Sequence, residues 1–247
     1  MSNSVYEGGN VRAPSIPLIG ILTMLTVACS NPAALFSPPY DPTLPTSWAA
    51  NVTNPYFPLA SGTTWQYRAQ TSKGVETITV EVLPGKETVN GVAATVIRDR
   101  VYLNGNLLED TFDSYAQDNE GNVWYVGEAT KEYANGVVVS TEGSWEWGVD
   151  GALPGIQMWA NPAAKVGSEY RQEYYKGHAE DWGKVISVGE AVTVPFGSMT
   201  NCITIEEWVG LDPGEPHDTK QYCPGVGNVS GGRPGASDRE VLISRTP

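Results

Sequence analysis

The residues best suited to chemistry lie in the segment RQEYYKGHAEDWGKV, from Arg171 to Val185, which holds one of the two histidines of the chain. Lys176-Gly177 has the composition of a two-residue hairpin turn, because glycine tolerates the positive φ that such turns need. A turn there pairs Glu173 with Glu180 and places His178 beside them. Like charges directly opposite each other destabilise a sheet, so this pairing predicts a cation or a shared proton between the carboxyl groups.

Three interpretations of this group are open. Glu173, His178 and Glu180 offer two oxygen donors and one nitrogen donor, a set that suits Zn²⁺ or Mn²⁺, or Ca²⁺ if the imidazole stays out. As an enzyme, the protein would use the two glutamates as acid and base of a glycoside hydrolase or lyase, with His178 beside them. The third interpretation is a solvated hairpin end, because a register inferred from one turn shifts easily.

A second group consists of tryptophans in the Gly- and Pro-rich stretch 143–167. Trp145 and Trp147 are two residues apart, so a strand would point both to the same side, and Trp159 follows closely. Exposed aromatic faces stack on sugar rings and on flat apolar molecules, whereas buried ones fill a core. The pattern predicts a platform of Trp145, Trp147 and Trp159 for a carbohydrate or a small apolar ligand, with core packing as the alternative.

The chain excludes several other classes of function. It has no G-x-S-x-G, H-E-x-x-H or G-x-x-x-x-G-K-[ST] motif, so neither a nucleophile elbow, a zincin helix nor a phosphate-binding loop is indicated. The 247 residues carry a formal net charge of −13. That charge repels nucleic acid, which is therefore not an expected partner.

The N-terminus has the features of an export signal. Arg12 precedes an uncharged, mostly apolar run from Ile16 to Ala28, which is too short for a membrane span of about 20 residues and typical of a secretory signal. The ending LTVAC resembles the lipobox of bacterial lipoproteins, in which a small residue precedes a cysteine that is lipidated after cleavage. Ala28 and Cys29 fit it, and Thr26 departs from it because Leu25 stands one place early. The resemblance implies a signal peptide over 1–28, a lipid on Cys29 and attachment to the membrane of the bacterial cell envelope; a plain secretory signal is the alternative.

The two remaining cysteines form an even pair. Folding the chain between them about Asp212-Pro213-Gly214, a turn signal, brings Cys202 opposite Cys223 across an antiparallel pair of strands. We therefore predict a disulfide, which persists in an oxidising compartment and agrees with export. Two free buried thiols are the alternative.

Composition divides the rest of the chain in two. Residues 29–58 contain seven prolines and one charged residue, Asp41, which predicts an extended tether. From residue 59 to 247 apolar and polar residues alternate, and Gly-containing turn pairs recur between the runs: Asn90-Gly91, Asn104-Gly105, Glu120-Gly121, Asn135-Gly136 and Lys176-Gly177. This pattern predicts an all-β domain, a mostly antiparallel meander of about ten strands forming a curved sheet, sandwich or barrel.

One stretch fits two kinds of structure. NLLEDTFDSYAQD has apolar residues at helical spacing, but turn signals flank it on both sides. We predict a strand in which Leu108, Phe112 and Ala116 share a face with Asp110 and Ser114.

These observations together predict an exported, lipid-anchored β-domain protein that binds a ligand or an envelope partner, with a structural divalent cation. Two alternatives stay open. One is an extracytoplasmic carbohydrate-active enzyme using Glu173 and Glu180, and the other is a β-barrel carrier of an apolar small molecule.

Overall fold

The computed structural model describes residues 40–247, so the predicted signal segment, the Ala28-Cys29 motif and the first part of the tether lie outside the described residues. Within residues 40–247 there are sixteen strands and no α-helix, which confirms the predicted all-β class. No helix of this part of the chain is long and apolar enough to cross a membrane. In chain order the elements are β1 (Thr64–Thr71), β2 (Gly74–Val82), β3 (Glu87–Val89), β4 (Val92–Leu103), β5 (Asn106–Gln117), β6 (Val123–Ala134), β7 (Val137–Ser140), β8 (Trp145–Glu146), β9 (Leu153–Met158), the 3₁₀ turn η2 (Pro162–Lys165), β10 (Glu169–Arg171), β11 (Glu173–Tyr174), β12 (Asp181–Val194), β13 (Gly197–Val209), β14 (Asp218–Cys223), β15 (Gly227–Gly232) and β16 (Glu240–Thr246).

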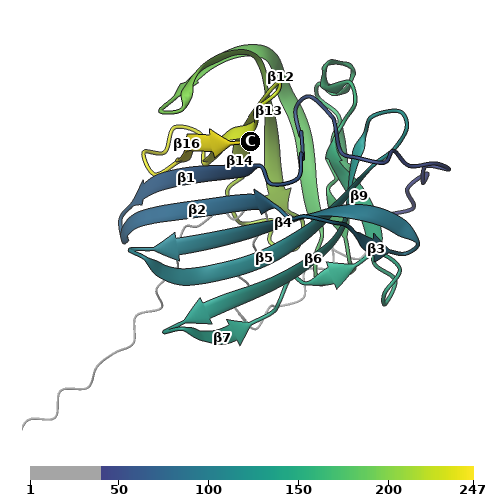
Figure 1. The fold of residues 1–247 in the computed structure, drawn as a ribbon, viewed down its shortest axis with the longest axis horizontal. Coiled ribbons are helices and arrows are strands. Elements are labelled where there is room, and N and C mark those ends of the chain that lie inside the picture. Colours follow the sequence, from purple (N-terminus) through teal and green to yellow (C-terminus); the bar gives the residue numbers. More distant parts are fainter. Residues whose placement is uncertain (1–39) are drawn as a thin grey trace, which may run out of the picture.

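The strands form one antiparallel sheet in the order β10-β12-β13-β14-β15-β16-β1-β2-β4-β5-β6-β9-β11, and β3, β7 and β8 pair at its side. The two terminal strands, β10 and β11, are consecutive in the chain and are separated by Gln172 alone. The sheet therefore curves round until its ends approach, so that it nearly closes into a barrel (Figure 1). We call residues 169–174, which join the two ends, the seam.

Local turn chemistry explains the long hairpins of this sheet. Asn90-Gly91, Asn104-Gly105 and Asn135-Gly136 connect β3 to β4, β4 to β5 and β6 to β7, and in each pair both residues have positive φ. Asparagine and glycine adopt that conformation at little cost, so the sequence fixes these reversals without help from distant residues. The predicted hairpin turns at these three places are confirmed.

The ambiguous segment is strand β5, as predicted. Asp113 pairs with Ile97 and Tyr115 with Thr95, and all four side chains are buried. Phe112, on the opposite side, is only half-buried, and Arg98 lies over its ring. The inner face of β5 therefore carries acidic and hydroxyl groups rather than the apolar series.

The described part of the predicted tether packs on the barrel. Val52 and Phe57 are buried, the Phe57 ring lies 4.9 Å from the Tyr115 ring, and the Leu59 amide donates to the Val52 carbonyl. Further along, the Trp48 ring lies 5.9 Å from that of Trp147. Apolar residues between the prolines, Val52 and Phe57 among them, thus bury against the core of the predicted β domain. We call residues 40–59 the strap.

Candidate functional site

The structure does not form the hairpin register predicted at Lys176-Gly177. Arg171 does pair with Trp182, but Tyr175 pairs with Ala179 rather than with His178. The loop between Tyr175 and Ala179 has three residues instead of two, and this extra residue shifts the register. Glu173 leaves the hairpin and pairs instead with Pro154 of β9. The predicted pairing of Glu173 with Glu180 is therefore wrong.

The three predicted ligands are consequently engaged in different places. Glu180 accepts from the Arg171 guanidinium at 3.0 Å and from the Gly177 amide at 2.9 Å. His178 is exposed, with its ring stacked 4.3 Å from that of Tyr175, while Glu173 is fully buried. Across residues 40–247 no group of three or more His, Cys, Asp or Glu side chains is arranged to hold a metal ion. The predicted cation site for Ca²⁺, Mn²⁺ or Zn²⁺, and the acid–base pair built on Glu173 and Glu180, are not formed.

The predicted tryptophan platform is not exposed. Trp145 and Trp147 are only 5% and 8% exposed, and both belong to the hydrophobic core. The Trp145 ring meets the Tyr125 ring edge-on at 5.2 Å. Trp159 is partly buried, and the ammonium of Lys165 lies 4.2 Å from its ring. Since β8 pairs with β6, the stretch that carries Trp145 is drawn inward, so the core alternative describes these residues.

Glu173 instead lies in an acidic group inside the barrel. Its Oε2 accepts from the Trp145 indole N–H at 2.6 Å, and its Oε1 has no hydrogen-bond partner among the described residues. Burial raises the pKa of Glu173 well above its ordinary value, and the nearby charge of Asp181 raises it further. This carboxyl group is therefore held protonated by its surroundings.

Asp113 and Glu128 form a second buried acidic pair next to it. The two residues are direct partners across β5 and β6. The Tyr125 hydroxyl oxygen lies 2.5 Å from Asp113 Oδ1 and 3.1 Å from Glu128 Oε2. Burial raises the pKa of both carboxyl groups, and for Glu128 the charges of Glu173 and Asp113 add to the effect. We call Asp113, Glu128, Glu173 and Asp181 the acid cluster.

Among residues 40–247, the ammonium group of Lys220 lies close to these carboxyl groups. Lys220 is 2% exposed, and its Nζ lies 2.7 Å from Glu207 Oε2. Burial by itself lowers the pKa of Lys220, but the charge and hydrogen bond of Glu207, with the charges of Glu240 and Asp181, outweigh burial and raise it. Lys220 thus stays charged and offsets part of the acid cluster, which contains more carboxyl groups than it can neutralise.

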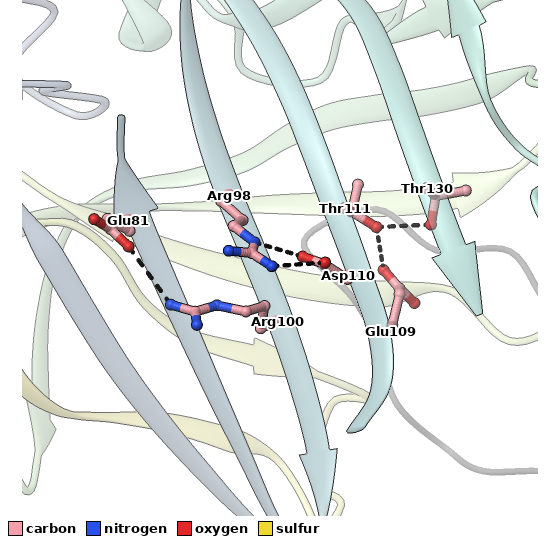
Figure 2. A network of polar contacts seen from close by, with 7 residues as sticks. All are labelled: Glu81, Arg98, Arg100, Glu109, Asp110, Thr111 and Thr130. Carbon is pink, nitrogen blue, oxygen red and sulfur yellow. Dashed lines mark hydrogen bonds and ion pairs between the residues drawn. The ribbon is translucent and has the colours of Figure 1, made fainter. Parts of the chain in front are cut away.

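The neighbouring strands show how the two faces of the sheet differ (Figure 2). Arg98 binds both oxygens of Asp110 at 2.7 and 2.8 Å, in a bidentate pair that links β4 to β5. Beside it, the Thr111 hydroxyl donates to Glu109 at 2.8 Å and lies 2.7 Å from the Thr130 hydroxyl. Burial raises the pKa of Glu109 to about 8, although the Thr111 hydrogen bond opposes this. The carboxylate of Asp110 thus has a cationic partner, whereas burial favours the neutral form of Glu109 on the inner face.

Sequence reasoning missed the acid cluster, although a partial signal exists. Every second residue of a strand points to the same face, and in β5 one such series is polar or aromatic: Glu109, Thr111, Asp113 and Tyr115. The sequence analysis considered only the other face, that of Leu108, Phe112 and Ala116. Nothing local indicates that Glu128 and Glu173 join them, because Glu173 reaches this place only when the sheet closes.

The outer face carries a band of stacked side chains that the sequence analysis did not identify. Arg171 lies 4.0 Å over the Trp182 ring, Trp182 is parallel to Trp208 at 6.1 Å, and Trp208 stacks on His217 at 4.7 Å. Trp182 and Trp208 are direct cross-strand partners on β12 and β13 and are partly exposed. On the other side of Arg171 lies the Tyr174 ring, at 5.2 Å. We call these five residues the aromatic band.

One cavity beside the strap is a candidate place for a carried molecule. Its volume is about 20 Å³, which is room for about one water molecule. Pockets for drug-sized ligands measure roughly 300–1,000 Å³. The large side chains that fill the core include Tyr115, Tyr125 and Tyr222, all fully buried. This cavity does not support the carrier alternative.

The predicted disulfide is confirmed. Cys202 and Cys223 are bonded, with their Cα atoms 4.2 Å apart, and they join β13 to β14. The neighbouring pair Ile203 and Tyr222 is in register, as folding about the Asp-Pro-Gly turn requires.

No protein-family model matches the chain, and no curated protein sequence matches it. Among solved structures, the chain is similar to that of a protein from Bacteroides fragilis that is thought to be exported and has a YmcC-like fold. The two share 14% sequence identity with a TM-score of 0.45, and the match covers 77% of this chain and 98% of the other.

Proposed function

We propose that the protein is an exported, lipid-anchored β-domain of the bacterial cell envelope that binds carbohydrate along the aromatic band. The observation that carries the binding proposal is the row of partly exposed rings formed by Trp182, Trp208 and His217. Aromatic surfaces of this kind pack against the C–H faces of sugar rings, and tryptophan provides the largest such surface. The ligand class is the one expected from the sequence, whereas the residues are different.

The polar groups around the band support a sugar rather than an apolar ligand. His217 Nδ1 lies 3.2 Å from Glu206 Oε1, and Glu180 is bound to the Arg171 guanidinium beside Trp182. Hydroxyl groups of a bound sugar can donate to these carboxylates while its rings lie on the indoles. The net charge of −13 favours neutral over acidic glycans.

Two features support export. The Cys202–Cys223 disulfide is the kind of bond that persists outside the reducing cytosol. The apolar run from Ile16 to Ala28, ending at Cys29, has the pattern of a lipoprotein signal. Attachment through Cys29 would tether the strap and the barrel to the envelope membrane that holds the lipid, in the periplasm or on the outer surface.

Binding is tested by isothermal titration calorimetry against a panel of soluble neutral and acidic oligosaccharides. Trp182→Ala and Trp208→Ala should each weaken binding of the glycan that the wild type recognises by about tenfold or more, about 1.4 kcal/mol. Phe112→Ala is the matched control, because Phe112 is a half-buried aromatic under Arg98 on another part of the outer face. Unchanged affinity in both tryptophan variants, or an equal loss in the control, would contradict the assignment.

The anchor is tested separately by metabolic labelling with a fatty acid analogue. The wild type should incorporate the label and fractionate with membranes, while Cys29→Ser should do neither. Label retained by Cys29→Ser would exclude Cys29 as the lipidated residue, and this result would leave the carbohydrate proposal unaffected.

A further inference from the structure

The barrel is closed at the seam by a very short strand pairing. Strand β11 has two residues, and its only pairs with β9 are Glu173 with Pro154 and Tyr174 with Leu153. Proline has no backbone N–H, so one of these pairs lacks a donor on the β9 side. By contrast, β4 and β5 pair over almost their whole length. The seam is therefore one of the shortest pairings of the sheet, like that of β15 with β16, and one of its residues is a proline without a backbone donor.

Side chains hold this junction from both sides. On the inside, Glu173 Oε2 accepts from the Trp145 indole. On the outside, the Tyr40 hydroxyl of the strap donates to the Pro154 carbonyl at 3.0 Å, and its ring lies 5.3 Å from that of Tyr174. Docking of β11 thus requires the Glu173 carboxyl group to remain in the barrel interior.

The groups that face Glu173 are mostly acidic. Glu128 and Tyr125 approach from β6, Asp113 from β5, and Asp181 from β12. Two cations offset these charges. Lys220 of β14, already paired with Glu207 of β13, acts on Glu173, and Arg171 of β10, paired with Glu180, acts on Asp181. A charged Glu173 would place another negative charge among these groups without water to screen it, and its Oε1 has no hydrogen-bond partner among the described residues to compensate.

We propose that Glu173 is a proton-operated latch of the barrel seam. Strand β11 stays docked on β9 while the carboxyl carries its proton, and it detaches when the proton is released to solvent. Detachment would expose the Glu173 carboxyl group and the indole N–H of Trp145 to water. Burial and the charge of Asp181, which both raise the pKa of Glu173 well above its ordinary value, support this direction.

Proton linkage predicts the size of the effect. The docked seam holds one proton more than the open seam at any pH between the ordinary pKa of a glutamate and the raised pKa of buried Glu173. The equilibrium constant for seam opening therefore rises about tenfold for each pH unit in that window, and it levels off above the raised pKa. Acidification closes the seam.

Hydrogen exchange of the intact, disulfide-bonded protein tests the latch. Opening constants are measured by mass spectrometry between pH 5 and pH 9 for peptides covering residues 153–158 and 172–175, after correction for the intrinsic pH dependence of exchange. The wild type should show the tenfold rise per pH unit. Glu173→Gln keeps an acceptor for Trp145 but cannot ionise. The opening constant of this variant should therefore rise with pH about tenfold less per pH unit than that of the wild type. Glu109→Gln is the control, since Glu109 is a buried carboxyl with a raised pKa on β5 that contacts Thr111 rather than the seam; it should keep the wild-type slope.

A wild-type opening constant that is independent of pH, or a wild-type slope retained in Glu173→Gln, would overturn the proposal. If Glu173→Gln does not fold, Asp181→Asn gives a second test. Removing the charge of Asp181 lowers the pKa of Glu173, so the levelling of the opening constant should occur at lower pH. A curve for Asp181→Asn that coincides with the wild-type curve would also overturn the latch.

Discussion

Asp113 and Glu128 face each other across β5 and β6, and the Tyr125 hydroxyl lies within hydrogen-bond distance of both carboxyl groups. Opposed carboxyl groups were expected from the sequence at Glu173 and Glu180. The barrel contains such a pair, but in its interior and on other residues. Two adjacent carboxylates cannot both ionise in a medium of low polarity, so a retained proton is the physical solution.

Stability should fall as the pH rises from 5.5 to 8.5. Burial raises the pKa of Glu76 and Glu240 to about 7 and that of Glu109 to about 8. A carboxyl group whose pKa is raised by folding stabilises the folded state fully at any pH below its pKa in the unfolded chain, which is near 4.3. This stabilisation is lost as the pH rises through the pKa of the group in the folded state. Each pH unit of this loss is worth about 1.4 kcal/mol, so a group with a folded pKa of about 7 contributes about 2 kcal/mol over the range and Glu109 about 3 kcal/mol. The melting temperature by circular dichroism should therefore drop by roughly 10 °C or more. An increase over the same range would contradict the assignment of neutral interior carboxyl groups.

Gly155→Ala should weaken the seam. A Cβ at this position would overlap the backbone carbonyl group of Gln172, which packs directly against it where β10 and β11 meet. Because backbone cannot yield as a flexible side chain does, we expect a loss of about 1–3 kcal/mol in the free energy of unfolding, measured with urea. Gly214→Ala is the matched control, since an added Cβ there meets only the Asp212 side chain at 3.6 Å. Equal stability of the two variants would exclude tight backbone packing at the seam.

Replacing both Cys202 and Cys223 by alanine should lower the free energy of unfolding by about 3 kcal/mol. The bond closes a loop with a sequence separation of 21, and this constraint on the unfolded chain is lost. Urea unfolding of the double variant, compared with wild type under oxidising and reducing conditions, measures the effect. Reductant should lower the midpoint of the wild type and leave that of the variant unchanged.

Phe57→Ala should destabilise the barrel although Phe57 lies in the predicted tether. Its side chain is 4% exposed and packs against Tyr115, so its removal should cost about 3–5 kcal/mol. Tyr56→Ala, which alters a partly exposed neighbour, is the control and should cost much less. Similar unfolding midpoints for Phe57→Ala and wild type would contradict a stabilising contact between the strap and the barrel core.

Features that depend on short stretches of chain could be predicted. Alternating apolar residues predicted the strands, and asparagine-glycine pairs such as Asn104-Gly105 predicted their reversals, because both signals act over a few residues. The Cys202–Cys223 bond followed from a turn midway between the two cysteines. By contrast, no local signal indicated that Glu173 leaves the hairpin and pairs with Pro154 of β9, which separates it from Glu180.

The sequence by itself determined an all-β chain with defined turns and a disulfide, since hydrogen bonding and φ preferences of neighbouring residues specify these. Only the tertiary structure decided which face of β5 is inside and which residues meet there. Asp113, Glu128 and Glu173 come from three separate strands, and Glu173 joins the other two only because the sheet curves far enough for β11 to reach β9. Closure of a sheet is a property of all its strands together, so no single segment encodes it.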